Sequence, residues 1–348
     1  MIRARLPRLA ASLLLALVTA CGGSSSKPST VPLPEDKPAE VAPAKPAEPP
    51  AEPPAPPMDP IELVLPATAP TIKLVSGGKG KKAKLAYVQK AGAKQQIKIL
   101  LDVTSAQTMA GQTDAVNIPT LVLVADAETK SVGADGATEY LATVTSADAL
   151  DVPNATVKVA DFKKDLITTV PGMTIAGTVG ANGVAGDMKL RIEKPDKSSM
   201  GAMQMVKLSM PMWPVLPKEP VGVGAKWTGA VKAMLQDKVE VTLTTTYELV
   251  SRAGSAWVVK GTTKVAGAEQ SLGDAKVGKI AGTGSIDAAV TDGVLFPATT
   301  AVTEIGFTAS QGAESLDVKF TTKGVVQAAD AGASTPAVAP ATPPAAKK

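Results

Sequence analysis

Five of the eleven methionines in this 348-residue chain fall within thirteen residues, and their thioethers are its most distinctive chemical groups. They are Met200, Met203, Met205, Met210 and Met212. Clustered thioethers can bind Cu(I), and flexible methionine surfaces suit apolar ligands. Methionine also fills irregular gaps in a core. We expect packing, with an apolar-ligand surface and a copper site as alternatives, and so predict no metal site and no cofactor.

Catalytic chemistry has little support in the residue types present. The chain has no histidine and one cysteine, which excludes Ser-His and Cys-His catalysis and most zinc sites. Two glycine-rich stretches, 77–82 and 222–227, lack the spacing and hydroxyl residue of a phosphate-binding loop. No motif indicates a Ser-Lys dyad or a carboxylate pair, so we predict that the protein is not an enzyme. A solvated turn, rather than a binding patch, is predicted for Lys79, Lys81, Lys82 and Lys84.

The single cysteine, Cys21, follows a signal-like segment. Three arginines precede the apolar stretch 9–20, which is too short to span a bilayer. The sequence Val18-Thr19-Ala20-Cys21 resembles the lipobox of bacterial lipoproteins. That resemblance implies a diacylglyceryl group on Cys21, cleavage before it and acylation of the new amino terminus. An ordinary secretory signal with a chance cysteine is the alternative.

Lipidation at Cys21 would anchor the protein stably, because two or more acyl chains hold a protein to a membrane. Gly22, rather than an aspartate, follows the cysteine, which favours the outer membrane of the cell envelope. Removing 1–20 removes three of 36 basic residues and leaves 33 against 32 acidic ones, a net charge of +1. The mature chain therefore offers no charge argument for a nucleic-acid partner.

Both ends of the mature chain have the composition of disordered segments. Residues 21–60 are rich in proline and contain no aromatic residue, so they bury too little apolar surface to fold. Fully extended, such a tether would reach about 120 Å from the lipid. The tail 328–348 has the same composition.

The region between the tethers, 61–327, reads as mainly β. Apolar residues alternate with polar ones in 95–104, 138–146, 238–250, 255–265 and 316–326, which predicts antiparallel sheet with one buried face. We expect two β-rich halves, 61–197 and 225–327, with one or two short helices. Similarity between 78–103 and 223–250 indicates a possible internal duplication.

Local signals predict three further elements. A hairpin over 172–193 turns at Asn182-Gly183 and directs Met188, Leu190 and Ile192 inward. A helix over 161–170 has Phe162, Leu166 and Val170 on one face and Asp161 as its cap. The stretch 197–208 suits either a helix or a strand, and we predict a helix that leads into an extended arm.

A Met/Pro-rich connector, 198–224, joins the predicted halves. Its prolines recur at every third residue from Pro211 to Pro220, which excludes helix and central strand. The sequence PKEPVGVGAKW resembles the P-x-x-P-V-G-x-G-x-x-W signature of a family of uncharacterised bacterial lipoproteins built on a domain of unknown function. The resemblance implies this layout and no activity. We expect Trp227 to be a buried anchor of the connector.

These observations predict a lipid-anchored envelope protein that acts as a non-catalytic scaffold or interaction module on a flexible arm. The alternative is a carrier whose curved sheet holds a lipid or another apolar ligand. An apolar cavity of roughly several hundred Å³ would favour the carrier. A filled core would favour the scaffold.

Overall fold

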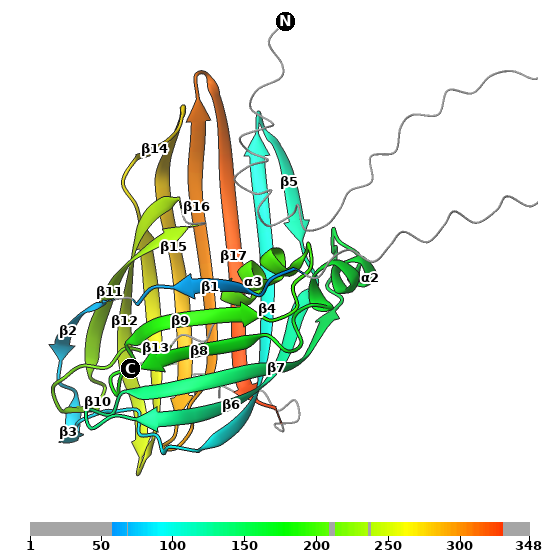
Figure 1. The fold of residues 1–348 in the computed structure, drawn as a ribbon. Helices are drawn as coiled ribbons and strands as arrows, with labels where there is room; N and C mark the ends of the chain where they lie inside the picture. Colours follow the sequence, from blue (N-terminus) through cyan, green and yellow to red (C-terminus); the bar gives the residue numbers. More distant parts are fainter. Residues whose placement is uncertain (1–57, 68, 209–212, 236–237, 330–348) are drawn as a thin grey trace, which may run out of the picture.

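The computed structural model describes residues 58–67, 69–208, 213–235 and 238–329 (Figure 1). Its main feature is one 15-stranded sheet in the order β1-β9-β8-β7-β6-β4-β17-β16-β15-β13-β12-β11-β2, with β5 beside β4 and β14 beside β15. Strands β3 and β10 form a separate two-stranded sheet. Every described pairing is antiparallel, so the predicted mainly β, antiparallel class is confirmed.

The elements have the following bounds. The strands of the first part are β1 (Ile61–Leu65), β2 (Thr71–Ser76), β3 (Lys79–Ala83), β4 (Lys94–Met109), β5 (Gln112–Asn117), β6 (Thr120–Val132), β7 (Thr138–Leu150), β8 (Thr174–Val179) and β9 (Ala185–Ile192). Those of the second part are β10 (Val221–Val223), β11 (Lys226–Leu235), β12 (Val239–Ala253), β13 (Ala256–Ala266), β14 (Gln270–Leu272), β15 (Ala275–Val290), β16 (Ala298–Gln311) and β17 (Glu314–Ala328). The helices are α2 (Val159–Phe162), the π-helix η1 (Lys163–Ile167) and α3 (Ser199–Leu208).

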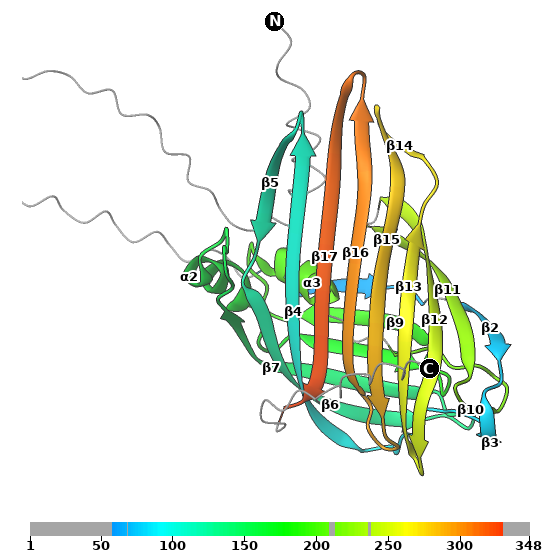
Figure 2. The ribbon, with the colours of Figure 1, turned by 180° about the vertical axis from the view of Figure 1, so that it is seen from behind.

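The sheet folds over itself into two layers. Strands β4 and β11–β17 run up the molecule, and β1 and β6–β9 cross them at a steep angle (Figures 1 and 2). Alternation along β4 explains how the layers meet, because Ile97, Ile99 and Leu101 are buried while Lys98 and Asp102 lie on the other side. The main core therefore forms where the crossing strands cover the lower part of the long ones.

The two predicted β-rich halves are parts of this one sheet. Strands β4 and β17 join them edge to edge, in a register that runs from Ile97 with Ala328 to Met109 with Leu316. Strand β2 leaves the first half and pairs with β11 in the second. The two similar stretches begin with strands of different length: 78–103 begins with the short β3, and 223–250 begins with the long β11. The duplication stays a prediction.

Two helical segments are found where helices are expected. In place of one helix over 161–170, α2 and η1 follow each other, and Phe162 and Val170 are buried as predicted. Asp161 is not the cap: Lys158 occupies that position without a side-chain bond, and Asp161 lies in the first turn. The side chain of Leu166 lies outside the described part. Helix α3 confirms the helical interpretation of 197–208.

The predicted hairpin is confirmed as β8 and β9, with Met188, Leu190 and Ile192 buried. Its turn is wider than a two-residue one, because the Gly180 amide donates to the Val184 carbonyl (2.8 Å). Of these two turn residues only Gly183 has a positive φ (78°), whereas a two-residue Asn-Gly turn needs a positive φ at both. A Cβ at Gly183 would lie 2.5 Å from the Pro214 carbonyl oxygen, so this glycine also lets the connector pack against the turn.

The predicted signal peptide, Cys21 and the tether as far as residue 57 lie outside the described residues, as does 330–348. The tail was expected to begin at 328, but β17 continues through Ala328, and the Ala329 amide donates to the Gln96 carbonyl (3.1 Å). Across the described ranges, no helix is long and apolar enough to cross a membrane.

Candidate functional site

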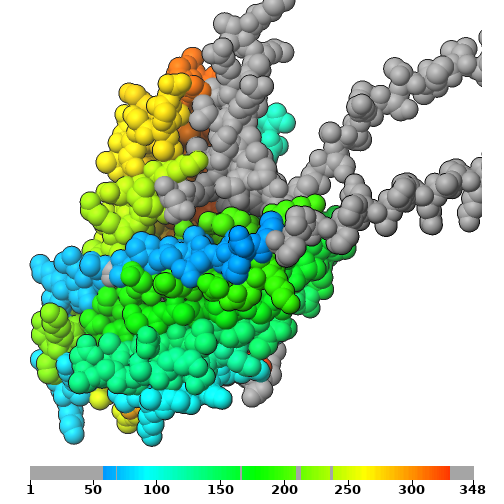
Figure 3. All heavy atoms as spheres, in the orientation of Figure 1, coloured from blue at the N-terminus to red at the C-terminus, as the bar shows by residue number. Residues whose placement is uncertain are grey.

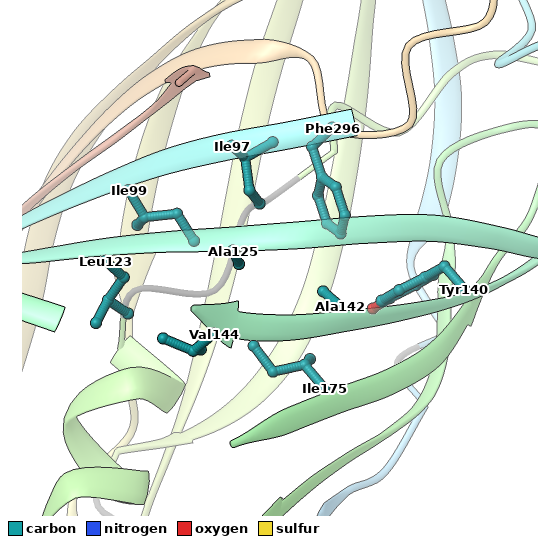
Figure 4. Close-up of a pocket in the computed structure, with 9 residues that line it drawn as sticks. All are labelled: Ile97, Ile99, Leu123, Ala125, Tyr140, Ala142, Val144, Ile175 and Phe296. Atoms are coloured by element: carbon teal, nitrogen blue, oxygen red, sulfur yellow. The ribbon is translucent and has the colours of Figure 1, made fainter. Parts of the chain in front are cut away.

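The space between the two layers is filled by side chains. A void lined by Ile97, Leu123, Ala142 and neighbouring apolar residues measures about 10 Å³ (Figure 4), and one water molecule needs about that much. Tyr140, Trp213 and Phe296 close this region, with ring centroids 5.2–5.8 Å apart. An acyl chain has no room there. By the criterion stated above, the region between the layers favours a scaffold over a carrier with an interior cavity.

Two tryptophans fix the connector between the layers. The Trp213 indole nitrogen donates to the Leu295 carbonyl (2.9 Å), and the Trp227 indole nitrogen donates to the Val215 carbonyl (2.6 Å). The Tyr87 hydroxyl donates to the Pro214 carbonyl (2.9 Å). Burial raises the pKa of Tyr87 well above its usual value, so this hydroxyl stays protonated and remains a donor. The connector, held by Trp213 and Trp227, is therefore a structural joint between the two layers.

Helix α3 separates the clustered methionines. Met203 and Met205 are buried in the main core, whereas Met200 is exposed. Met210 and Met212 lie outside the described residues. The two buried thioethers fill core volume, as the packing interpretation predicts. Within the described residues, no group of three or more His, Cys, Asp or Glu side chains could hold a metal ion.

The strongest candidate site lies higher on the long strands. Their inner side continues past the crossing layer as a mainly apolar cluster, which we name the upper face, and eight of its fifteen side chains are at most 7% exposed. Its residues are Val231, Ala233, Leu235, Val239, Val241, Leu243, Val265, Val277, Ile280, Ile305, Phe307, Ala309, Leu316, Val318 and Phe320. Two of the four phenylalanines in the chain belong to it.

Register places these side chains on one side of the sheet. Leu243 pairs with Val265, and Ile305 pairs with Phe320, and paired residues in an antiparallel sheet point the same way. A row of threonines separates the upper face from the main core below. In that row the Thr245 and Thr263 hydroxyls lie 2.8 Å apart, and Thr303 pairs with Thr322.

The opposite side of the same strands is polar. Lys232 pairs with Glu240 (3.1 Å) and Lys319 with Glu304 (2.9 Å). No residue of the upper face carries a charge. The sheet is therefore amphipathic along its whole height, including the part that extends beyond the crossing layer.

No strand or helix of the described residues packs across the upper face. Figures 1 and 2 show the tips of β4, β15, β16 and β17 rising well beyond β1 and α3. The buried side chains of the upper face form a second apolar cluster beside the main core, and its half-exposed members, among them Leu243 and Phe307, are the part that a ligand or a partner could reach.

The sequence-based predictions named no ligand-binding residue, so the upper face was missed. A usable signal existed in strand length. β15 has 16 residues and β12 has 15, whereas the crossing strands β8 and β9 have 6 and 8. A layer of short strands cannot cover the full height of long ones, so alternation sustained that far predicts apolar surface left without a covering layer.

Comparisons with known proteins add no family. No family model matches the chain, and a comparison with curated proteins finds no match. The lipoprotein family suggested by the P-V-G-x-G-x-x-W signature therefore stays a prediction.

Proposed function

We propose that this protein is a lipid-anchored envelope protein whose upper face binds an apolar ligand, most simply the acyl chains of a lipid. The observation that carries the proposal is the apolar upper face on β11–β17, which rises beyond the crossing layer (Figure 1). The filled interior directs the proposal away from a cavity between the layers and toward the upper face.

The size of the upper face suits such a ligand. The upper face crosses six strands, which lie about 4.8 Å apart and give it a width of about 24 Å. About four residues along each strand give it a height of about 13 Å, so its outline covers roughly 300 Å². Eight of its side chains are already at most 7% exposed, so a ligand would gain apolar contact mainly with the half-exposed ones, such as Leu235, Leu243 and Phe307.

The chemistry of the upper face favours acyl chains over an extended peptide. Its residues are Val, Leu, Ile, Phe and Ala, and they offer no side-chain donor or acceptor. An extended peptide would bury unpaired backbone N–H and C=O groups there, at a cost of about 1–3 kcal/mol each. An acyl chain has no such groups. The predicted anchor at Cys21 would keep the upper face near membrane lipids.

An interaction module is the second candidate function, and the filled interior favours it. A partner helix satisfies its own backbone groups, so it could also lie on an apolar sheet surface. In that case the upper face would bind protein and would not bind free lipid.

A fluorescent fatty acid distinguishes these functions. The ligand is titrated into mature chain 21–348 carrying Cys21→Ser, and into the same chain with Ile305→Asp or with the milder Ile305→Thr. Val302→Asp is the matched control, because Val302 lies on the outer side of β16 beside Lys323. We expect saturable binding that Ile305→Asp reduces at least tenfold and Val302→Asp leaves unchanged. Absence of binding by the parent chain would favour the interaction module.

A further inference from the structure

We propose that β3 and β10 form a cationic ribbon that contacts an anionic phospholipid surface. The ribbon presents Lys79, Lys81 and Lys82, with Lys84 directly after it. This inference is independent of the upper face.

The charged residues in this part of the chain are all basic. Between Glu62 and Asp102 the sequence contains eight lysines and no acidic residue. Lys79, Lys81, Lys82 and Lys84 are exposed, and none forms an ion pair with a described residue. Many lysines on the outer side of the sheet are paired, for example Lys226 with Glu248 (3.3 Å). The ribbon therefore carries positive charge without a compensating group among the described residues.

The ribbon is held tightly, unlike the solvated turn that the sequence predicts. A Cβ at Gly222 would lie 2.1 Å from the Lys79 carbonyl oxygen, and one at Gly78 would lie 2.2 Å from the Gly222 carbonyl oxygen. The Gly222 amide donates to the Gly77 carbonyl (2.9 Å). Glycine 222 of the P-V-G-x-G-x-x-W signature thus lets the two backbones approach, and the lysines project from a fixed strand.

Apolar side chains accompany the charge. Val75, which precedes the ribbon, is 62% exposed, and Val223, which pairs with Lys79, is 45% exposed. Lysines attract an anionic lipid surface, and exposed aliphatic side chains can enter its interfacial layer. A polyanion in water would use the lysines but not the valines. This combination favours a phospholipid surface.

The ribbon also has an exposed position in the molecule. It lies at the lower corner of the fold, at the opposite end from the tips of β15, β16 and β17 (Figures 1 and 2), and the chain around it projects at the lower left of Figure 3.

Vesicle co-sedimentation tests the ribbon with mature chain 21–348 carrying Cys21→Ser, so that no lipid anchor contributes. Phosphatidylcholine vesicles with and without phosphatidylglycerol are compared, for the parent chain and for Lys79→Gln/Lys81→Gln/Lys82→Gln. The control is Lys158→Gln/Lys194→Gln/Lys264→Gln, three exposed lysines without an ion pair in the described part. All six lysines are exposed, so both triple variants should fold.

We expect binding only to vesicles that contain phosphatidylglycerol, and its loss at high salt. About 1 kcal/mol per lysine near the surface makes the ribbon variant roughly 100-fold weaker, whereas the dispersed control should bind nearly as the parent chain does. Equal weakening in both variants, or no binding by the parent chain, would overturn the proposal. Binding to heparin without binding to the vesicles would also overturn it, in favour of a soluble polyanion.

Discussion

The Trp227 indole nitrogen in β11 lies 2.6 Å from the Val215 carbonyl oxygen in the connector and donates a hydrogen bond to it. The ring is fully buried and stacks on Tyr247, with centroids 5.7 Å apart. In register, Trp227 also lies beside Leu74 of β2. One side chain thus joins the connector, the edge strand and the second half of the sheet, as the interpretation of a buried anchor predicts.

Replacing this anchor should lower stability strongly. We expect Trp227→Ala to cost about 3–5 kcal/mol in the free energy of unfolding, as truncations of buried aromatics do. Trp227→Phe keeps most of the apolar contact and leaves the Val215 carbonyl unpaired, so it should cost about 1–3 kcal/mol. Urea unfolding of both variants measures this. An alanine variant that melts within about a degree of the parent would contradict the role of Trp227 as an anchor of the connector.

Gly222→Ala should loosen the ribbon. The added Cβ would lie 2.1 Å from the Lys79 carbonyl oxygen, so the backbone of β3 or of β10 would have to move. We expect a loss of about 1–3 kcal/mol and faster tryptic cleavage at Lys79–Lys82. Gly306→Ala is the matched control, since a Cβ there meets nothing closer than 3.6 Å. Unchanged cleavage in Gly222→Ala would show that the close approach is not needed.

Asp196 should make α3 sensitive to acid. Its carboxylate accepts hydrogen bonds from the Ser198 amide (2.8 Å), the Ser198 hydroxyl (2.7 Å) and the Ser199 hydroxyl (3.1 Å). Burial alone would raise the pKa of Asp196, but these bonds outweigh burial and lower the pKa. A lowered pKa means that the folded state favours the ionised form of Asp196. The stability that this carboxylate contributes is therefore complete when the pH is above the ordinary pKa of about 3.9, and it is lost as the pH falls below that value.

Asp196→Asn should therefore flatten the loss of stability as the pH falls below about 3.9, at a cost near neutrality of about 1 kcal/mol because the hydrogen bonds to a charged acceptor are weakened. Thermal unfolding at a series of pH values measures both effects. Asp114→Asn, on the exposed part of β5, is the control and should leave the pH profile unchanged. The same pH profile for the Asp196 variant and the parent would contradict this role of the Asp196 carboxylate.

Cys21→Ser should move the protein from the membrane to the soluble fraction of the envelope. The single cysteine at the lipobox position motivates this expectation. Cell fractionation with immunoblotting checks it, and Ser24→Ala, three residues further along, is a neutral control. A Cys21→Ser protein that still sediments with membranes would show that another part of the chain anchors it.

Local patterns predict much of this fold and little of its candidate site. Alternation locates β12, β13 and β17, because each strand buries one side of a pleated surface. The pairing of β2 with β11 could not be predicted, since it joins residues about 150 apart and local sequence does not encode their register. Alternation at Ile305 shows which side is apolar, but not whether another layer covers that side. The upper face depends on this second fact.

Native mass spectrometry of the protein extracted from its own membrane bears most directly on the upper face as a lipid-binding surface. We predict a mass above that of the chain with its covalent modifications, accounted for by one or more non-covalently bound, acyl-bearing molecules. Val302→Asp should retain this additional mass and Ile305→Asp should lose it. A spectrum that shows only the chain with its covalent modifications, under conditions that preserve weak complexes, would contradict lipid binding by the upper face.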